Sequence, residues 1–519
     1  SFTAALSVTC NDQSWESPCR ATDVCLIAVD SVMIVEATGG RGHFTSVLVI
    51  AEYGYGHSLV VQRAGLQAWR STINVSSAEA TIVSALSISA VQGVLAMSVM
   101  NVSLAAWQSN VSAVSNYLSQ ILCITLHNQG MPLFVQGAMI SGVGKGQLLA
   151  RAGELAVIAT VSASYRSTTV ECRDIAISLQ NCSVTARTVT GWYAIAVAVL
   201  IFQDVLSLTA TNLSLDVGHS TVDAVSATHA ALVVVVGNIG RCGVMVLENL
   251  SMIVRDDSEP TAVNGLLTPA NYVVAVAVLS AVHSHGAILR GDLRMQIDES
   301  VVRCETQLSF AVALSVVSLE VGGDITLGPN IAAVIIASHP RSNLSVRAKT
   351  AAMVLSLAGA AGDRRTMITM LAPPNTSSSF PFGVDGVVPN RNITFVAADI
   401  IATSSATLDL SVTLSAWADE TIGSVITLPP GALTFVVCGA AVSEVEPDTA
   451  GVGTKFGPMH VPTNLDVQAF VTPKCPSSSD VFPRLPVLSQ AIFFATTFAS
   501  ASPNFHGFGC AATLRHSDQ

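Results

Sequence analysis

Three groups of acidic residues have the composition that glycoside hydrolysis requires. That reaction uses two carboxyl groups at a set separation, one acting as the acid and the other as nucleophile or base. The groups are Asp256–Asp257 with Glu259, Asp298–Glu299, and Asp419–Glu420. All lie in polar breaks between apolar runs, and none recurs at a regular spacing. Unpaired acids are mostly exposed in proteins, so we interpret these groups as solvated loops and predict no catalytic residue.

Two further patterns resemble binding motifs for a metal or a phosphate. His283 and His285 would share one face of a strand, but no acid or cysteine stands at a matching offset nearby. The GVGKG segment, Gly142–Gly146, lacks the Ser or Thr that follows the lysine of a phosphate-binding loop. The sequence therefore predicts no metal ion and no cofactor.

The acceptor sequence for N-glycosylation, Asn-x-Ser/Thr, occurs nine times. The acceptors are Asn74, Asn101, Asn110, Asn181, Asn212, Asn249, Asn343, Asn375 and Asn392. Glycosylated asparagines lie on the surface of secreted proteins. Asn375 lies in the segment PPNTSSSFP, an evident loop, and is the predicted glycosylation site.

The segment VLSLTATNLSLDV contains two alternating apolar runs that are out of phase. Leu206, Leu208 and Ala210 share one phase, and the run that starts at Leu213 has the other. Side chains alternate strictly along a strand, so one straight strand cannot turn both runs toward one core. The phase slip therefore predicts a sharp corner at Asn212.

The same pattern surrounds other asparagines, with apolar residues at offsets −4, −2, +1 and +3. It predicts a structural ladder of corner residues at Asn101, Asn181, Asn212 and Asn249. Asparagine tolerates the left-handed backbone of such a corner, and stacked amides can bond along the axis. Because an asparagine inside a ladder is out of reach of the glycosylation machinery, we expect these four to be structural.

Runs of small and branched apolar residues accompany the corners, such as AIAVAVLIF from Ala194, AALVVVV from Ala230 and YVVAVAVL from Tyr272. Each long unit therefore contains a strand, a corner, a strand, a polar loop and a strand. Buried parallel strands have such continuous apolar runs, and stacked repeats share one core. We predict an all-β fold, a right-handed parallel β-helix with three strands per coil and terminal caps.

The expected organisation has three parts. Residues 1–23 form an N-terminal leader or cap, 24–440 the parallel β-helix, and 441–519 a Pro-rich C-terminal cap or small appended region. The best candidate for a helix is Leu148–Ala156. Since Ser1 opens the chain without a charged and apolar leader, we expect a processed chain or a fragment.

Composition excludes several classes of protein. Half of the residues are hydrophobic and 11% are charged, which excludes disorder for most of the chain. The longest apolar run, Trp192–Phe202, is shorter than the roughly 20 residues of a membrane-spanning helix. The net charge of −11 argues against a nucleic-acid partner.

The eleven cysteines form clusters at the two ends and are scattered between them. Cys10, Cys19 and Cys25 are close enough in sequence to staple an N-terminal cap, and buried free thiols are the equal alternative there. For the scattered central cysteines we expect buried free thiols. An odd count leaves at least one thiol unpaired within the chain.

The repeated NLSL, NVSL and NCSV segments, the Ala/Val-rich runs, the few lysines and the cysteine-bearing start resemble large surface proteins of kinetoplastid protozoa. The dispersed gene family proteins are similar in texture over residues 24–440. The resemblance implies a membrane-associated surface protein with pectin-lyase-like β-helical repeats and an adhesive role.

We therefore expect a non-enzymatic surface or secreted glycoprotein with a structural or adhesive role. Its partners would be host or extracellular glycans or proteins. The alternative is a polysaccharide lyase or glycoside hydrolase on the same fold, and a third reading is a pseudoenzyme that keeps a sugar groove. The five tryptophans share no offset in the repeat, which weakens a groove for sugars.

Overall fold

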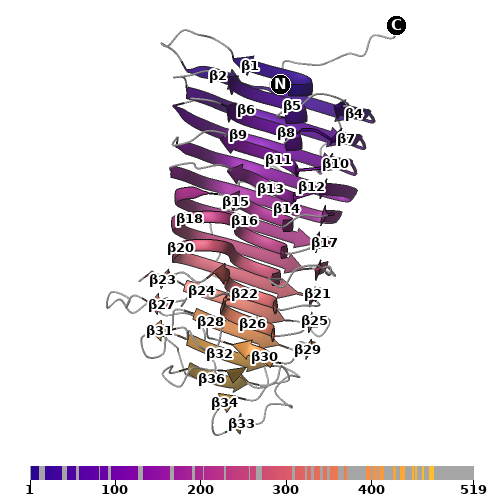
Figure 1. The fold of residues 1–519 in the computed structure, drawn as a ribbon. Helices are drawn as coiled ribbons and strands as arrows, with labels where there is room; N and C mark the ends of the chain where they lie inside the picture. The colour runs from indigo at the N-terminus through magenta and orange to yellow at the C-terminus, as the bar shows by residue number, and fades with distance from the viewer. Residues whose placement is uncertain are drawn as a thin grey trace.

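The computed structural model is all-β, and its strands stack as rungs from the N-terminal to the C-terminal end (Figure 1). The structure describes residues 2–472 except 11–17, 38–43, 54–57, 81, 92–94, 127–131, 164–168, 190–192, 203, 227–228, 256–257, 265–271, 307–309, 322–323, 329–331, 339–342, 348–350, 361–366, 371–392, 399–400, 406–407, 414–424, 428–432, 439–446, 449–450, 453–458 and 461–466. None of these described residues is helical. A single sheet of 34 strands holds almost all of them. The predicted parallel β-solenoid is confirmed.

The strands of the first half are β1 (Phe2–Cys10), β2 (Cys19–Thr22), β3 (Cys25–Val29), β4 (Val32–Ala37), β5 (Phe44–Tyr53), β6 (Ser58–Trp69), β7 (Thr72–Ser77), β8 (Ile82–Val91), β9 (Ala96–Trp107), β10 (Asn110–Ser115), β11 (Leu118–Leu126), β12 (Leu133–Ala152), β13 (Leu155–Ala163), β14 (Thr169–Thr188), β15 (Tyr193–Phe202), β16 (Val205–Gly218), β17 (Thr221–Ser226) and β18 (His229–Arg255). Those of the second half are β19 (Glu259–Asn264), β20 (Tyr272–Asp298), β21 (Val301–Thr306), β22 (Phe310–Val321), β23 (Asp324–Leu327), β24 (Ala332–Ser338), β25 (Asn343–Arg347), β26 (Ala351–Ala360), β27 (Met367–Met370), β28 (Ile393–Ala398), β29 (Ile401–Ser405), β30 (Leu408–Thr413), β31 (Val425–Thr427), β32 (Leu433–Cys438), β33 (Pro447–Asp448), β34 (Gly451–Val452), β35 (Met459–His460) and β36 (Val467–Thr472).

The pairings divide the solenoid into four parallel ladders, named A to D in the order in which a coil visits them. Ladder A joins β2, β6, β9, β12, β14, β16, β18, β20, β23, β27 and β31. Ladder B starts at β3, uses the C-terminal parts of the same long strands from β6 to β20, and continues through β24, β28, β32 and β36. Ladder C joins β4, β7, β10, β12, β14, β17, β19, β21, β25 and β29. Ladder D joins β1, β5, β8, β11, β13, β15, β18, β20, β22, β26, β30 and β35.

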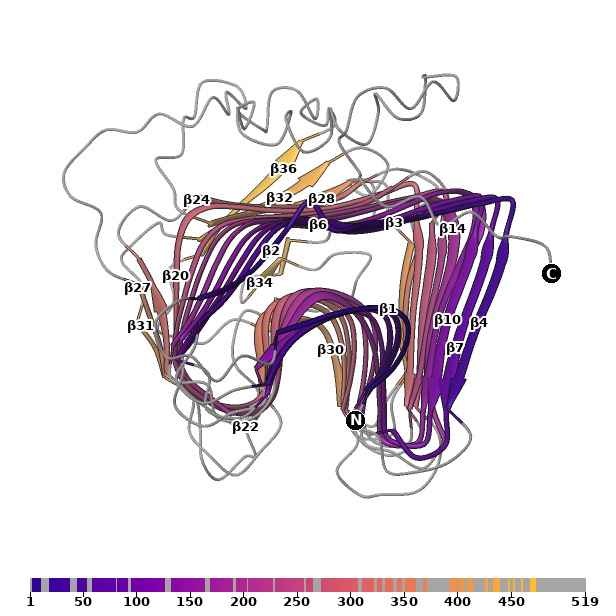
Figure 2. The same cartoon turned by 90° about the horizontal axis from the view of Figure 1, so that it is seen from above.

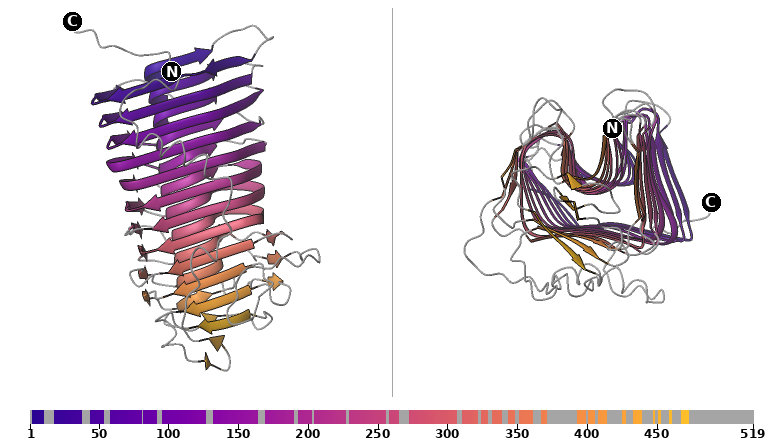
Figure 3. Two further views of the ribbon diagram at one scale, coloured as in Figure 1. Left: turned by 180° about the vertical axis from the view of Figure 1, so that it is seen from behind. Right: turned by 90° about the horizontal axis from the view of Figure 1, so that it is seen from below.

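Each long coil thus contributes four strand segments, where the sequence predicts three. The extra segment arises because the chain bends twice in succession, first at a residue such as Asn212 and again seven residues later at His219, both with a positive φ. The second bend directs the chain into ladder C. Figure 3 shows the resulting stack from behind and from below.

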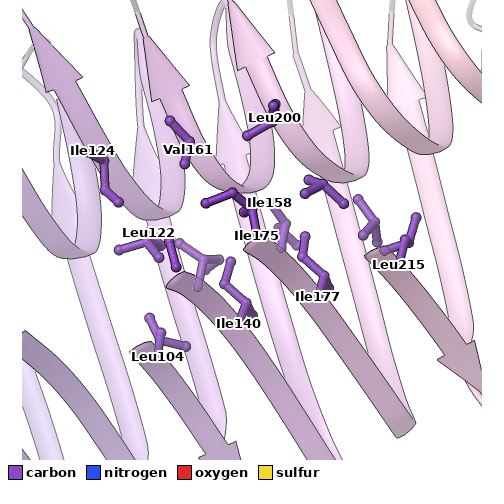
Figure 4. Packing of buried hydrophobic residues seen from close by; sticks show 14 of the residues in the cluster. Leu104, Leu122, Ile124, Ile140, Ile158, Val161, Ile175, Ile177, Leu200 and Leu215 are labelled. Carbon is purple, nitrogen blue, oxygen red and sulfur yellow. The ribbon is translucent and has the colours of Figure 1, made fainter. Parts of the chain in front are cut away.

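The core follows the phase slip in β16. Leu208 and Ala210 before Asn212, and Leu213 after it, are all buried. Leu206, which the alternation assigns to the same face, is instead 67% exposed, and Val205 fills the core at that level. The side chains inside the solenoid stack in columns along its axis, as in Leu104, Ile140, Ile177 and Leu215 (Figure 4). Each such buried side chain contributes about 1.5–3 kcal/mol.

Ladder D curves as an arch into the cross-section (Figure 2). Every residue of β15 from Ala194 to Phe202 is buried, so both faces of this strand are covered. Val157, Ile195, Ala198 and Ile201 form an apolar cluster separate from the main core. Burial on both faces explains why these strands have continuous rather than alternating apolar sequences.

The ladders run past both boundaries that the sequence predicts. Before residue 24, β1 pairs with β5, and β2 pairs with β6. After residue 440, β36 pairs with β32. The predicted helix at Leu148–Ala156 is wrong, because these residues lie at the end of β12 and the start of β13. Cross-coil pairing outweighs the weak helical periodicity of this segment.

Candidate functional site

Ladders A and B meet at a one-residue bend that we call the first corner. Successive coils place Asp23, Arg63, Asn101, Gly137, Asp174, Asn212, Asn249 and Gly291 there, with φ between 54° and 71°. L-residues rarely adopt this left-handed conformation, and Gly, Asn and Asp adopt it most readily. All of these residues except Arg63 are of those three types, so the backbone demand explains the composition of the corner.

Side chains at the first corner bond along the axis over only part of its length. The Asn249 amide donates to Asn212 Oδ1 at 3.1 Å, and the Asn212 amide donates to Asp174 Oδ1 at 2.9 Å. Gln136 Nε2 adds a donor to Asp174 Oδ2 at 3.3 Å. Asn101 lies outside this run, because the next coil carries Gly137 at the equivalent position.

Asn101 and Gly137 are nevertheless matched in shape. A side-chain Cβ at Gly137 would lie 2.6 Å from Asn101 Oδ1. Gly291 stands in the same relation to Asn249, with 2.4 Å to its Oδ1. Asparagine at this corner therefore leans over a glycine in the next coil, or bonds to another polar side chain.

Asn181 lies elsewhere, at a second corner between ladders B and C. This corner holds Asp30, Arg70, Gln108, Gly144, Asn181, His219 and Glu299, with φ between 45° and 81°. The prediction that Asn181 stacks with Asn212 is wrong, because the register places Asn181 beside His219. Both corners demand the same backbone conformation, so the residue type alone does not distinguish them.

The corner asparagines lie on the outside of the solenoid. Asn101 and Asn181 are exposed, and Asn212 and Asn249 are half-buried. The expectation that all four are out of reach therefore fails for the first two. Asn375, the predicted glycosylation site, lies outside the described residues.

A buried hydroxyl ladder follows the second corner, and sequence reasoning missed it. Ser31, Ser71, Ser109, Ser220 and Ser300 each follow a left-handed residue of this corner, and Ser258 continues the ladder by accepting the Ser220 N–H. All of these serines except the half-buried Ser31 are buried. The Ser71 and Ser220 hydroxyls donate to carbonyls two residues earlier, at 2.8 and 2.7 Å. They accept the backbone N–H groups of Ser31 and Cys182 in the preceding coil, both at 3.1 Å. In the coils that bend at Asp23, Arg63, Asn101 and Asn212, the signal in the sequence is a polar residue seven positions after the first corner, followed by Ser.

The GVGKG segment interrupts this hydroxyl ladder. Gly144 has φ 81° at the second corner, and the register shifts between Val143 and Gly146, so that Lys145 is one residue more than the neighbouring coils carry. A Cβ at Gly146 would lie 2.5 Å from the Ser109 carbonyl oxygen. The glycines thus allow a tight bulge between strands. This geometry differs from that of a phosphate-binding loop, in which a glycine-rich turn leads into a helix.

Several charged side chains on the described coils form pairs along the axis, while Arg173 pairs with Glu171 within β14. Arg63 and Arg70 bind Asp23 and Asp30 of the preceding coil through two hydrogen bonds each, at 2.5–2.7 Å. Arg255 pairs with Asp216, and Arg290 with Glu248. Hydrogen bonds from the guanidinium groups hold the pKa of Asp23 and Asp30 below the ordinary range. A carboxylate kept ionised in this way is a poor general acid.

The acidic groups singled out by sequence are described only in part. Glu299 takes the left-handed position of the second corner. Asp298 ends β20, and Glu259 begins β19. Asp256–Asp257 and Asp419–Glu420 lie outside the described residues. His283 and His285 both lie in β20.

Two tryptophans stack across neighbouring coils. Trp69 and Trp107 are in register, with ring centroids 4.8 Å apart and planes 4° apart. They share the same offset from the first corner, six residues after Arg63 and Asn101, which corrects the statement that tryptophans have no common offset. Because the rings cover each other face to face, the pair stabilises the stack and leaves less ring surface for a sugar.

The first rungs carry an apolar patch on their outer surface. The patch consists of Ile27 and Val29 of β3 and Val32 and Ile34 of β4, which are 38%, 39%, 71% and 67% exposed. In the next coil Thr72 and Asn74 lie beside Val32 and Ile34. Polar side chains thus replace the two most exposed members of the patch in the next coil of ladder C.

The described cysteines are of two kinds. Cys19 is disulfide-bonded. Cys25, Cys123, Cys172, Cys182, Cys242 and Cys304 are buried thiols outside any disulfide. Burial raises the pKa of Cys123 and Cys242 to about 12 and that of Cys182 to about 11, so these thiols are not poised as nucleophiles. This agrees with the expectation of buried thiols for the central cysteines.

Within the described ranges, no group of three or more His, Cys, Asp or Glu side chains could hold a metal ion. The same residues include no helix long and apolar enough to cross a membrane. Searches against protein-family models, curated proteins and solved structures found no match.

Proposed function

We propose that this chain is a non-enzymatic structural protein of the cell surface or extracellular space, in which the β-solenoid serves as a stiff adhesive rod. The observation that carries the proposal is the direction of its polar contacts. First-corner amides, second-corner hydroxyls and the carboxylate pairs of Arg63, Arg70, Arg255 and Arg290 bond to the neighbouring coil. An enzyme groove would instead collect acids and bases from several coils around one open space.

Stiffness follows from the same contacts. Each coil contacts its neighbours through four ladders, and one continuous apolar cluster reaches from Ala21 to Ile325. Stacked repeats of this kind gain stability from every interface between neighbours. The rod can therefore hold a binding surface at a fixed distance from its point of attachment.

The disulfide at Cys19 supports a location outside the reducing cytosol. Disulfides persist mainly in secreted and surface proteins. The buried thiols are compatible with that location, because burial keeps them from exchange.

The adhesive surface that we propose is the apolar patch of Ile27, Val29, Val32 and Ile34. Its chemistry suits a protein partner, because contiguous exposed aliphatic groups mark protein contacts. The double variant Val32→Ser/Ile34→Ser should reduce binding of the purified rod to partner cells at least fivefold. The matched control, Val114→Ser/Val225→Ser, removes two half-buried valines from the same ladder and should leave binding unchanged.

The enzymatic alternative is tested on the same protein. Incubation with acidic and neutral polysaccharides, followed by reducing-end and unsaturated-uronate detection, should give no product. Turnover that is lost in Glu299→Gln would overturn the proposal of a non-enzymatic protein. Equal binding by the patch variant and its control would show that the apolar patch is not the adhesive surface.

A further inference from the structure

We propose that the folded protein carries N-linked glycans on Asn101, Asn110 and Asn181 and excludes them from Asn74, Asn212 and Asn249. This rests on the proposed route through the secretory pathway. The donor is a polyprenyl-diphosphate oligosaccharide. The asparagine Nδ2 forms a bond to C1 of the first sugar, the C1–oxygen bond to the diphosphate breaks, and Nδ2 loses one proton as the polyprenyl diphosphate leaves.

The three accepting asparagines share an open environment. Asn101 is on the first corner, Asn110 begins β10, and Asn181 is on the second corner. All three are exposed. Among the described residues, none accepts a hydrogen bond from their side-chain amides, so a sugar on Nδ2 displaces no such bond.

The three excluded asparagines are held by neighbouring coils. Asn74 Oδ1 accepts the hydroxyl of Ser112 at 2.8 Å, which fixes its side chain on the half-buried face of ladder C. Asn212 both donates to Asp174 and accepts from Asn249. Adjacent coils are only about 4.8 Å apart, so a sugar ring on Asn212 or Asn249 would separate the side chains that bond there.

The chain contains its own matched controls. Asn74, Asn101 and Asn110 all begin the tripeptide Asn-Val-Ser, and Asn212 and Asn249 both begin Asn-Leu-Ser. Transfer to the nascent chain depends on the tripeptide, so the first three should be modified with similar efficiency before folding. Differences in the folded product then report the folded environment.

The test is site-by-site occupancy in wild-type protein expressed through a eukaryotic secretory pathway. Enzymatic deglycosylation in H₂¹⁸O marks each occupied asparagine, and mass spectrometry compares the secreted and the retained protein. In the secreted fraction we expect occupancy at Asn101 and Asn110 at least tenfold above that at Asn74. Asn181 should follow the first pair, and Asn212 and Asn249 should follow Asn74.

Retained protein should be enriched in glycans at Asn74. The variant Ser76→Ala destroys that acceptor tripeptide without changing Asn74, and it should raise the secreted share. Equal occupancy of Asn74 and Asn101 in secreted protein would overturn the proposal, as would full occupancy at Asn212. A cytosolic location of the native protein would contradict the proposed function. It would not change the glycan occupancies measured in protein expressed through the secretory pathway, so the two proposals can fail separately.

Discussion

The first and second corners impose the same left-handed backbone, yet they are stabilised in different ways. At the first corner the left-handed residues themselves make the cross-coil contacts, through exposed or half-buried side chains. At the second corner the contact comes from the following serine, whose hydroxyl is buried and bonds to backbone on two coils. Cross-coil support at the first corner therefore varies with the residue type. At the second corner a following serine recurs on both sides of the coils that bend at Gly144 and Asn181, and the Arg70–Asp30 pair adds a contact between left-handed residues in the first coils.

This difference has an energetic reason. A buried N–H group that loses its acceptor costs about 1–3 kcal/mol, because water cannot replace the lost bond. An amide at the surface can exchange its partner for water at little cost. Loss of a serine hydroxyl at the second corner should therefore cost more stability than loss of an asparagine amide at the first.

The largest effect should come from Ser220→Ala. The change removes the acceptor of the Cys182 N–H and the donor to the Gly218 carbonyl, both buried contacts. We expect a loss of about 1–3 kcal/mol in the stability of this region, measured by urea denaturation with hydrogen exchange as a local probe. Thr221→Ala, one residue later on an exposed site, is the control and should change stability by less than about 0.5 kcal/mol. Equal effects of Ser220→Ala and Thr221→Ala would show that the buried hydroxyl does not stabilise the second corner.

A smaller effect is expected from Asn212→Ala. Alanine loses both amide contacts and must keep φ 56°, which costs an L-residue about 1–2 kcal/mol. Asn212→Gly loses the same contacts without the backbone penalty, so it should be more stable than the alanine variant by about 1 kcal/mol. Thermal denaturation of the two variants measures the difference. If glycine proves as damaging as alanine, the amide and not the conformation is the requirement at the first corner.

The smallest effect concerns acid and the arginine pairs of the N-terminal coils. Because the pKa of Asp23 and Asp30 is lowered in the folded state, their contribution is complete above the unfolded value of about 4. It is lost as the pH falls through the lower folded value. Hydrogen exchange of β3 and β6 should therefore accelerate below about pH 4, and less so in Asp23→Asn/Asp30→Asn. The pairs are solvent-exposed, so high salt should also diminish the effect. An unchanged pH profile in the variant would assign the acid sensitivity to other groups.

Much of the fold could be predicted from the sequence because its strongest signals are local. The phase slip at Asn212 requires a corner, and the continuous apolar runs require strands buried on both faces. Stacked parallel strands satisfy both requirements. Leu206 was misassigned because alternation says nothing about where a strand first enters its ladder, and there Val205 is the buried residue.

The assignment of residues to corners could not be predicted in the same way. Asn181 and Asn212 have the same local pattern, since apolar residues flank both corners alike. Gly137 and Asp174 occupy the first corner between Asn101 and Asn212, but they share no residue type with them. Trp69 was not aligned with Trp107 because its coil bends at Arg63, a residue that the asparagine pattern does not include.

Hydrogen exchange at the Cys182 amide tests the central claim most directly. That N–H donates to the Ser220 hydroxyl of the next coil at 3.1 Å. In peptides that span 175–188, it should be protected in the wild type and should exchange at least about fivefold faster in Ser220→Ala. It should be unaffected by Asn212→Gly. Unchanged protection in Ser220→Ala, or a loss caused by Asn212→Gly alone, would contradict the account of two differently stabilised corners.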